Sequence, residues 1–179
     1  MTVPENVTLN DLTLSCTTGG VSVYGTDANF TQGLSSTTIT GSVLLNFTRC
    51  AFGDNFAGTT TTGGVILNTY NAEYTQDITC TLTTTTGGIT MNIQQYIDMG
   101  ANVTGTATTV TGGISVIYID TVASVGARFT GSTTTGGVSY NDVLGFTSGT
   151  SNDYSDPGNK YTIASTTTTG GISITGSSQ

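Results

Sequence analysis

Carboxylates are the side chains of this sequence that come closest to a catalytic pattern. The chain of 179 residues has 11 Asp and Glu, 3 Lys and Arg, and no His. Six acids each fall in a separate repeat of the chain, and paired carboxylates are the acid–base machinery of polysaccharide-cleaving enzymes. These six residues are Asp27, Asp54, Glu73, Asp98, Asp120 and Asp142. They occupy no equivalent position and lack basic neighbours, so we interpret them as solvated turn residues and predict that the protein is not an enzyme.

A second group of oxygen ligands lies between residues 145 and 159, in a segment rich in Gly, Ser, Asn and Asp. Hard oxygen ligands in such a loop could hold Ca²⁺. The residues concerned are Asn152, Asp153, Asp156 and Asn159. Their spacing does not match an EF-hand loop, and an ordinary Asx-rich turn is the favoured interpretation. We therefore expect no metal site and no cofactor.

Composition excludes several functions. Without His, neither a Ser-His-Asp triad nor a His metal site can form. Three basic residues and a net charge of -8 exclude nucleic-acid binding. No apolar run approaches the roughly 20 residues of a spanning helix, so no membrane insertion is expected. The three cysteines, Cys16, Cys50 and Cys80, lack the spacing of a zinc or redox motif and are interpreted as small apolar core residues.

The candidate residues lie in a chain that is built of repeats. A Thr run followed by Gly-Gly and a β-branched residue occurs six times, at 17–21, 61–65, 85–89, 110–114, 134–138 and 168–172. A degenerate copy lies at 39–43. Counted from the first glycine of each copy, the steps are 22, 22, 24, 25, 24 and 34 residues. A second landmark, a small or polar pair followed by an apolar residue, recurs in phase with the first, so we conclude that nearly the whole chain is repetitive.

Side chains alternate between apolar and polar after each Gly pair, as in residues 89–93, and this period of two is typical of strands. Single units of about 24 residues cannot enclose a core, but stacked units can. We predict an all-β, β-helix-like β-solenoid of about seven stacked coils of 22–25 residues. It forms one domain over residues 1–179, with a loop insertion at about 145–159. An antiparallel β-sandwich is the alternative.

The unit Ala-x-[Phe/Val/Tyr]-Thr-Gly…Thr-Thr-Thr-Gly-Gly-Ile-Ser-Val resembles the Thr/Gly-rich β-strand repeats of the adhesin family of bacterial and archaeal surface proteins. The resemblance covers residues 6–175. It implies a one-sided β-helix at a cell surface, and it carries over no catalytic residue.

The expected location is the cell surface or the extracellular space. Residues 1–5 do not resemble a signal peptide, so we interpret the chain as a domain of a longer exported protein, with a cytoplasmic protein as the alternative. Four sequons are candidate glycosylation sites if the chain is exported. They begin at Asn6, Asn29, Asn46 and Asn102.

The predicted function is that of a non-enzymatic structural or adhesin-type module. Two alternatives are a Thr-ladder solenoid that binds ice and a β-helix enzyme that acts on polysaccharides. Residues 168–175 form a complete repeat with only four residues after them, so we expect an uncapped terminal coil. Through that coil the chain would contact a second copy of itself or a neighbouring domain. Carbohydrate or another surface protein is a further expected partner.

Overall fold

The computed structural model describes residues 1–97, 101–120, 126–141 and 160–178. These residues form strands and turns without a helix. Thr, Val and Ile dominate the strands because their branched side chains favour a pleated backbone. The residues predicted as a loop insertion, 145–159, lie outside the described part of the chain, and so does the suggested Ca²⁺ loop.

Two sheets contain all the described strands. Sheet A has 11 strands. Its eight-strand path comprises β1 (Thr2–Val3), β4 (Val21–Thr26), β7 (Val43–Thr48), β10 (Val65–Tyr74), β12 (Ile89–Ile97), β14 (Ile114–Asp120), β18 (Ile172–Ser178) and β16 (Val138–Asn141), in this spatial order. Three short strands lie beside this path, namely β2 (Thr8–Leu9), β5 (Asn29–Phe30) and β8 (Ala51–Phe52).

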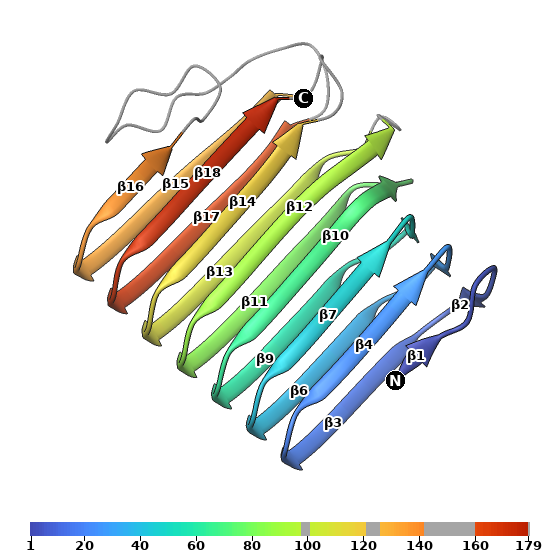
Figure 1. Cartoon of the computed structure of the whole chain (residues 1–179), viewed down its shortest axis with the longest axis horizontal. Coiled ribbons are helices and arrows are strands. Elements are labelled where there is room, and N and C mark those ends of the chain that lie inside the picture. The colour runs from blue at the N-terminus through green and yellow to red at the C-terminus, as the bar shows by residue number, and fades with distance from the viewer. Residues whose placement is uncertain (98–100, 121–125, 142–159, 179) are drawn as a thin grey trace.

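Sheet B has seven strands. In spatial order they are β3 (Leu12–Thr18), β6 (Leu34–Thr40), β9 (Phe56–Thr62), β11 (Ile78–Thr86), β13 (Val103–Thr111), β17 (Lys160–Thr169) and β15 (Gly126–Thr135). Each strand of sheet B leads through a corner, Gly-Gly or Gly-Ser, into a strand of sheet A. We call each such pair of strands an arch, and Figure 1 shows the arches side by side, from β3 and β4 at one end to β15 and β16 at the other.

Every strand pairing in the described residues is parallel, and equivalent positions of neighbouring arches lie in register. Ile89, for example, aligns with Val65 on one side and with Ile114 on the other. Repeats of nearly equal length therefore stack as identical layers. The predicted β-solenoid is confirmed, and the antiparallel sandwich is wrong.

The order of the layers differs from the order of the repeats. β17 pairs with β13 on one side and with β15 on the other, so the last arch in the sequence lies between two earlier ones. β18 likewise lies between β14 and β16. The expectation that residues 168–175 end the stack is therefore wrong, and the terminal arch is β15 with β16. The 34-residue step, from Gly136 to Gly170, coincides with this change of order.

The glycine corners hold neighbouring arches together. The first glycine of each corner has a positive φ, between 103° and 145°. The amide N–H of Gly112 donates to the carbonyl oxygen of Thr169 at 2.9 Å, and equivalent bonds of 2.8 Å join Gly41 to Thr62 and Gly63 to Thr86. Glycine is required because a Cβ at Gly112 would overlap the backbone carbonyl of Gly87 in the adjacent arch.

The core is one continuous column of side chains between the two sheets. Alternate residues of each strand point inward, as in β11, where Ile78, Cys80 and Leu82 are buried. Near the ends of the strands opposite the corners, aromatic rings pack against one another, and the rings of Phe30 and Phe52 stack with centroids 5.3 Å apart. The three cysteines are free. Cys50 and Cys80 are fully buried, as predicted for core residues, whereas Cys16 is half-buried and packs against the edge of the core.

Candidate functional site

The outer surface of sheet B is the most regular surface that the structure describes. Two ranks of hydroxyl side chains cross all seven strands, and together they define what we call the hydroxyl face. The first rank consists of Ser15, Thr37, Thr59, Thr83, Thr108, Thr166 and Ser132. The second consists of Thr18, Thr40, Thr62, Thr86, Thr111, Thr169 and Thr135.

These ranks exist because each strand pairs in register with the next. Parallel strands lie about 4.8 Å apart, so the hydroxyl groups of one rank repeat at about that interval. Between the two ranks the side chains are also mostly Thr, with Ile39 and Val110 as exposed apolar exceptions. The hydroxyl face is therefore a regular lattice of donors and acceptors, and two aliphatic side chains lie between its ranks.

A third threonine position lies on the inner side of the same strands and fixes the corners. Thr84 is buried, and its hydroxyl group donates to the carbonyl oxygen of Gly63 at 2.9 Å. The same bond recurs from six arches, donated by Thr38, Thr60, Thr84, Thr109, Thr133 and Thr167 to the corner glycine of a neighbouring arch. In the first arch, Cys16 occupies this position. Inward threonines are thus structural, and outward threonines remain available to a ligand.

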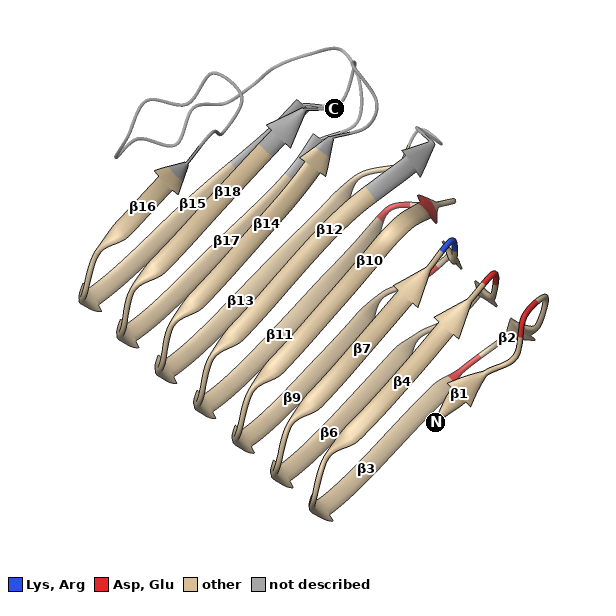
Figure 2. Cartoon of the chain, in the orientation of Figure 1, with Lys and Arg blue, Asp and Glu red and all other residues tan. Residues whose placement is uncertain are grey.

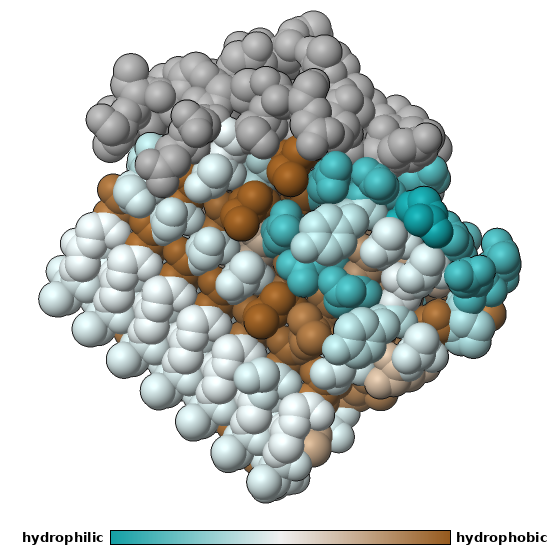
Figure 3. Space-filling model, in the orientation of Figure 1, coloured by the Kyte–Doolittle hydropathy of each residue, from teal (hydrophilic) through white to brown (hydrophobic). Residues whose placement is uncertain are grey.

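The outer surface of sheet A is different, although its strands obey the same geometry. One of its rows contains Leu44 and Ile66 beside Thr90, and another contains hydrogen-bonded asparagines, with the amide of Asn68 donating to Asn46 at 3.2 Å. Figure 3, in which sheet A faces the viewer, shows hydrophobic and strongly polar side chains mixed on this surface. The fold alone therefore does not require hydroxyl groups at outward positions.

Described charged residues lie mainly at the ends of the strands opposite the glycine corners (Figure 2). Asp27 forms a bidentate ion pair with Arg49 at 2.6 and 2.7 Å, and the hydrogen bond from that guanidinium holds the pKa of Asp27 below its usual value. Asp77 accepts hydrogen bonds from Asn102, which lowers the pKa of its carboxyl group. The hydroxyl face thus carries no charge among the 14 residues that define it.

The acids singled out in the sequence do not form a described catalytic pair. Asp27 is occupied by Arg49, Asp54 caps the N–H of Asn55 at 2.6 Å, and Glu73 lies in β10. The backbone of Asp120 ends β14, whereas Asp98 and Asp142 lie outside the described residues. Among the residues that the structure describes, no three His, Cys, Asp or Glu side chains gather closely enough to hold a metal ion.

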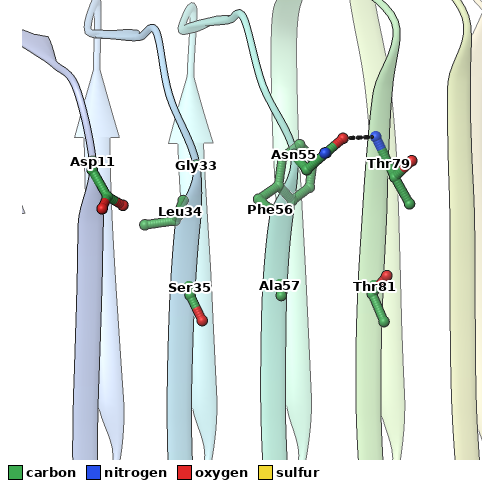
Figure 4. A pocket seen from close by; sticks show the side chains of 9 residues that line it. All are labelled: Asp11, Gly33, Leu34, Ser35, Asn55, Phe56, Ala57, Thr79 and Thr81. Atoms are coloured by element: carbon green, nitrogen blue, oxygen red, sulfur yellow. Dashed lines mark hydrogen bonds between the residues drawn. The ribbon is translucent and has the colours of Figure 1, made fainter.

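A shallow groove crosses the loop-side ends of β3, β6, β9 and β11 (Figure 4). Small residues, Gly33, Ser35 and Ala57, leave space in the sheet surface, and the side-chain oxygen of Asn55 accepts a hydrogen bond from the backbone of Thr79 at 2.5 Å. Asp11 at one end is its single charged lining residue. Besides Asp11, the polar lining consists of Ser35, Asn55, Thr79 and Thr81.

The sequons have unequal exposure. Asn6, Asn29 and Asn102 are exposed, whereas Asn46 is half-buried and its side-chain oxygen accepts a hydrogen bond from Asn68. Asn102 is engaged by Asp77. Glycosylation thus stays a prediction, with Asn6 and Asn29 the most accessible of the four amides.

Sequence reasoning identified the Thr runs but missed the two ranks. The signal is present in the repeats when they are aligned on the first glycine of each corner. The residue immediately before this glycine is Thr in every copy, and the residue four positions before it is Ser or Thr in every copy.

Comparison with known proteins gives no relative on which a function can be based. No protein-family model matches the chain, and no curated protein and no solved structure matches it either. The resemblance to the adhesin family stays a prediction. Within the described residues, no helix combines the length and the apolar character that a membrane crossing requires.

Proposed function

We propose that this protein is a non-enzymatic structural module of adhesin type, located at a cell surface or outside the cell, that acts through its hydroxyl face. The observation that carries the proposal is the difference between the two sheets. Sheet A tolerates Leu44 and Ile66 at outward positions, whereas both ranks of sheet B keep a hydroxyl group in all seven arches.

A hydroxyl lattice without charge suits a ligand that is itself extended, polar and uncharged. Each Thr or Ser hydroxyl group donates one hydrogen bond and accepts others, so it pairs with the hydroxyl groups of a polysaccharide directly or through water. Single contacts of this kind are weak, but a rank of seven on a rigid stack presents them at a fixed interval. Because no charge takes part, the expected binding depends little on salt.

Sedimentation with insoluble polysaccharides tests this proposal. Thr83 on sheet B and Thr90 on sheet A are half-buried outward threonines of the same arch, so Thr83→Lys and Thr90→Lys form a matched pair. The wild type and Thr90→Lys should sediment with at least one polymer, and Thr83→Lys should sediment several-fold less. Equal binding by the two variants, or no binding to any polymer or intact cell surface, would contradict the proposal.

Ice is a second candidate ligand, and the regularity of the ranks favours it. Consecutive threonines in the sequence argue against an ice-binding face, because alternate side chains point inward. The structure shows that the inward threonines, such as Thr84, are bonded to the corners, while Thr83 and Thr86 remain outside in unbroken ranks. Freezing-point depression, measured on the wild type and the same two variants, tests this candidate. A loss confined to Thr83→Lys supports it, and an inactive wild type eliminates it.

A further inference from the structure

Among the described strands, sheet B ends in an unpaired edge on each side of the stack. In this part of the chain, β3 pairs with β6 alone and β15 pairs with β17 alone. Unpaired edges of regular sheets are templates for another strand. This observation is independent of the proposed function, because it concerns the ends of the stack and not its outer face.

The two edges have complementary hydrogen-bonding groups. At each corner a glycine N–H donates to a threonine carbonyl of the next arch, from Gly19 and Thr40 through to Gly170 and Thr135. Within the described residues, this series leaves the carbonyl oxygen of Thr18 without a glycine donor at one end. At the other end, the series leaves the N–H of Gly136 without a threonine acceptor.

A second series of corner bonds has the same polarity. The N–H of Val21 donates to Ser42 at 2.9 Å, and the series ends with the N–H of Ile172 donating to Gly137 at 2.9 Å. Among the described corner bonds, this series gives no donor to the carbonyl oxygen of Gly20 at the β3 end. It gives no acceptor to the N–H of Val138 at the β15 end. In these two series, main-chain donors are thus left at the β15 edge and main-chain acceptors at the β3 edge, where the thiol of Cys16 also donates to the carbonyl oxygen of Thr18 at 3.0 Å.

We propose that copies of this chain stack head to tail, with β15 of one copy paired to β3 of the next. Continuing the register of sheet B places Leu12 beside Phe129, Leu14 beside Gly131 and Ser15 beside Ser132. Both ranks of the hydroxyl face then run from one copy to the next without a break.

The side chains at the junction also match. Leu12, Leu14 and Cys16 are only partly buried at the β3 edge, although they pack against the core. Leu14 would lie beside Gly131, a large residue next to one without a side chain. Within the stack, Leu82 already lies beside Gly58 in this way. Covering the exposed parts of these residues gives the association an apolar contribution.

The junction uses sheet B and the corners, because the beginning of the chain covers part of sheet A. β1 pairs with Tyr24 and Gly25 of β4. Because two different edges meet, the contact is heterologous and forms open chains of copies. The net charge of -8 on each copy opposes association, so added salt should favour it.

Engineered disulfides test the register of this contact. Ser15 and Ser132 lie on opposite edges of the seven-stranded sheet, about 29 Å apart at about 4.8 Å per strand, so a bond between them can form only between copies. We expect Ser15→Cys with Ser132→Cys to give a ladder of cross-linked oligomers under mild oxidation at high salt. The control pair, Thr13→Cys with Ser132→Cys, is out of register by two residues and should give several-fold less. Both pairs are made with Cys16→Thr, which removes the half-buried native thiol.

Sedimentation of Cys16→Thr by itself gives a second measurement. Threonine at this position adds the hydroxyl donor that the other six arches have, and in the proposed stack it meets the carbonyl oxygen of Gly136. One such bond, about 1 kcal/mol, corresponds to about fivefold tighter association. A monomer at millimolar concentration and high salt overturns the proposal. Association with equal or absent cross-linking of the two pairs also overturns it, because the copies would then meet through another surface.

Discussion

Replacement of a corner glycine by alanine is the sharpest perturbation of the stack. Gly112 has a φ of 145°, and a Cβ there would overlap the carbonyl of Gly87. Its neighbour Gly113 has no such φ, and a Cβ there would lie 3.4 Å from the carbonyl oxygen of Gly171, an ordinary contact. The same substitution at adjacent residues of one corner therefore separates backbone geometry from any general effect of removing a glycine.

The magnitude for Gly112→Ala follows from the interactions at that corner. A side chain at this φ costs about 1–3 kcal/mol. Relief of the overlap moves the Gly87 and Gly112 arches apart and weakens the bonds from Gly87 to Thr111 and from Thr109 to Gly87, which are 2.8 and 3.1 Å long. At about 1 kcal/mol for each bond, the total loss is about 3–5 kcal/mol. For a protein of this size it lowers the melting temperature by about 6–20 °C.

Thermal unfolding followed by circular dichroism measures both variants. Gly113→Ala should change the melting temperature by only a few degrees, since alanine also restricts the unfolded chain by about 0.4–1 kcal/mol. Equal melting temperatures for the two variants would refute the geometry of the corner. They would also refute the stacking derived from it.

Two further predictions concern the core and the layer order. Ile114 is 2% exposed, so Ile114→Asp buries a charge without a partner and should lower stability by several kcal/mol in thermal unfolding, whereas Ser115→Asp, facing outward, should have little effect. Equal losses of stability in the two variants would contradict the assignment of Ile114 to the inner face and Ser115 to the outer face of the sheet. Thr108→Cys should form a disulfide with Thr166→Cys in the adjacent strand and fail to do so with Ser132→Cys, two strands away at about 10 Å. A disulfide with Ser132→Cys and none with Thr166→Cys would instead show that the layers follow the order of the repeats in the sequence.

The fold could be predicted from the sequence because two signals agree in every repeat. The alternation after each Gly pair, as from Ile89 to Ile93, identifies the inner face, and the return of the corner every 22 to 25 residues identifies the stack. The layer order could not be predicted from the same signals. β15 and β17 carry nearly the same residues at the positions that could pair with β13, so the repeat pattern does not distinguish them, and only the 34-residue step indicates an irregularity.

The site was only partly predictable, for a local physical reason. Strict alternation along a Thr run places every second hydroxyl group inside, and Thr84 is indeed buried. At the corner, however, the strand pairing passes from Thr84 directly to Thr86, and Thr85 and Thr86 are both exposed. This irregularity turns the residue before the glycine outward and creates the second rank. An alternation rule without knowledge of the corner geometry cannot anticipate it.

The most direct test of the hydroxyl face as the functional surface replaces three aligned outward residues on each sheet. The variant on sheet B carries Thr59→Lys, Thr83→Lys and Thr108→Lys; the control on sheet A carries Thr90→Lys, Ser115→Lys and Ser173→Lys, at aligned outward positions. Retention on the immobilised ligand of the wild type, measured for both folded variants, should be lost by the first and kept by the second. Retention of the first variant together with loss of the second would contradict the assignment and place the functional surface on sheet A.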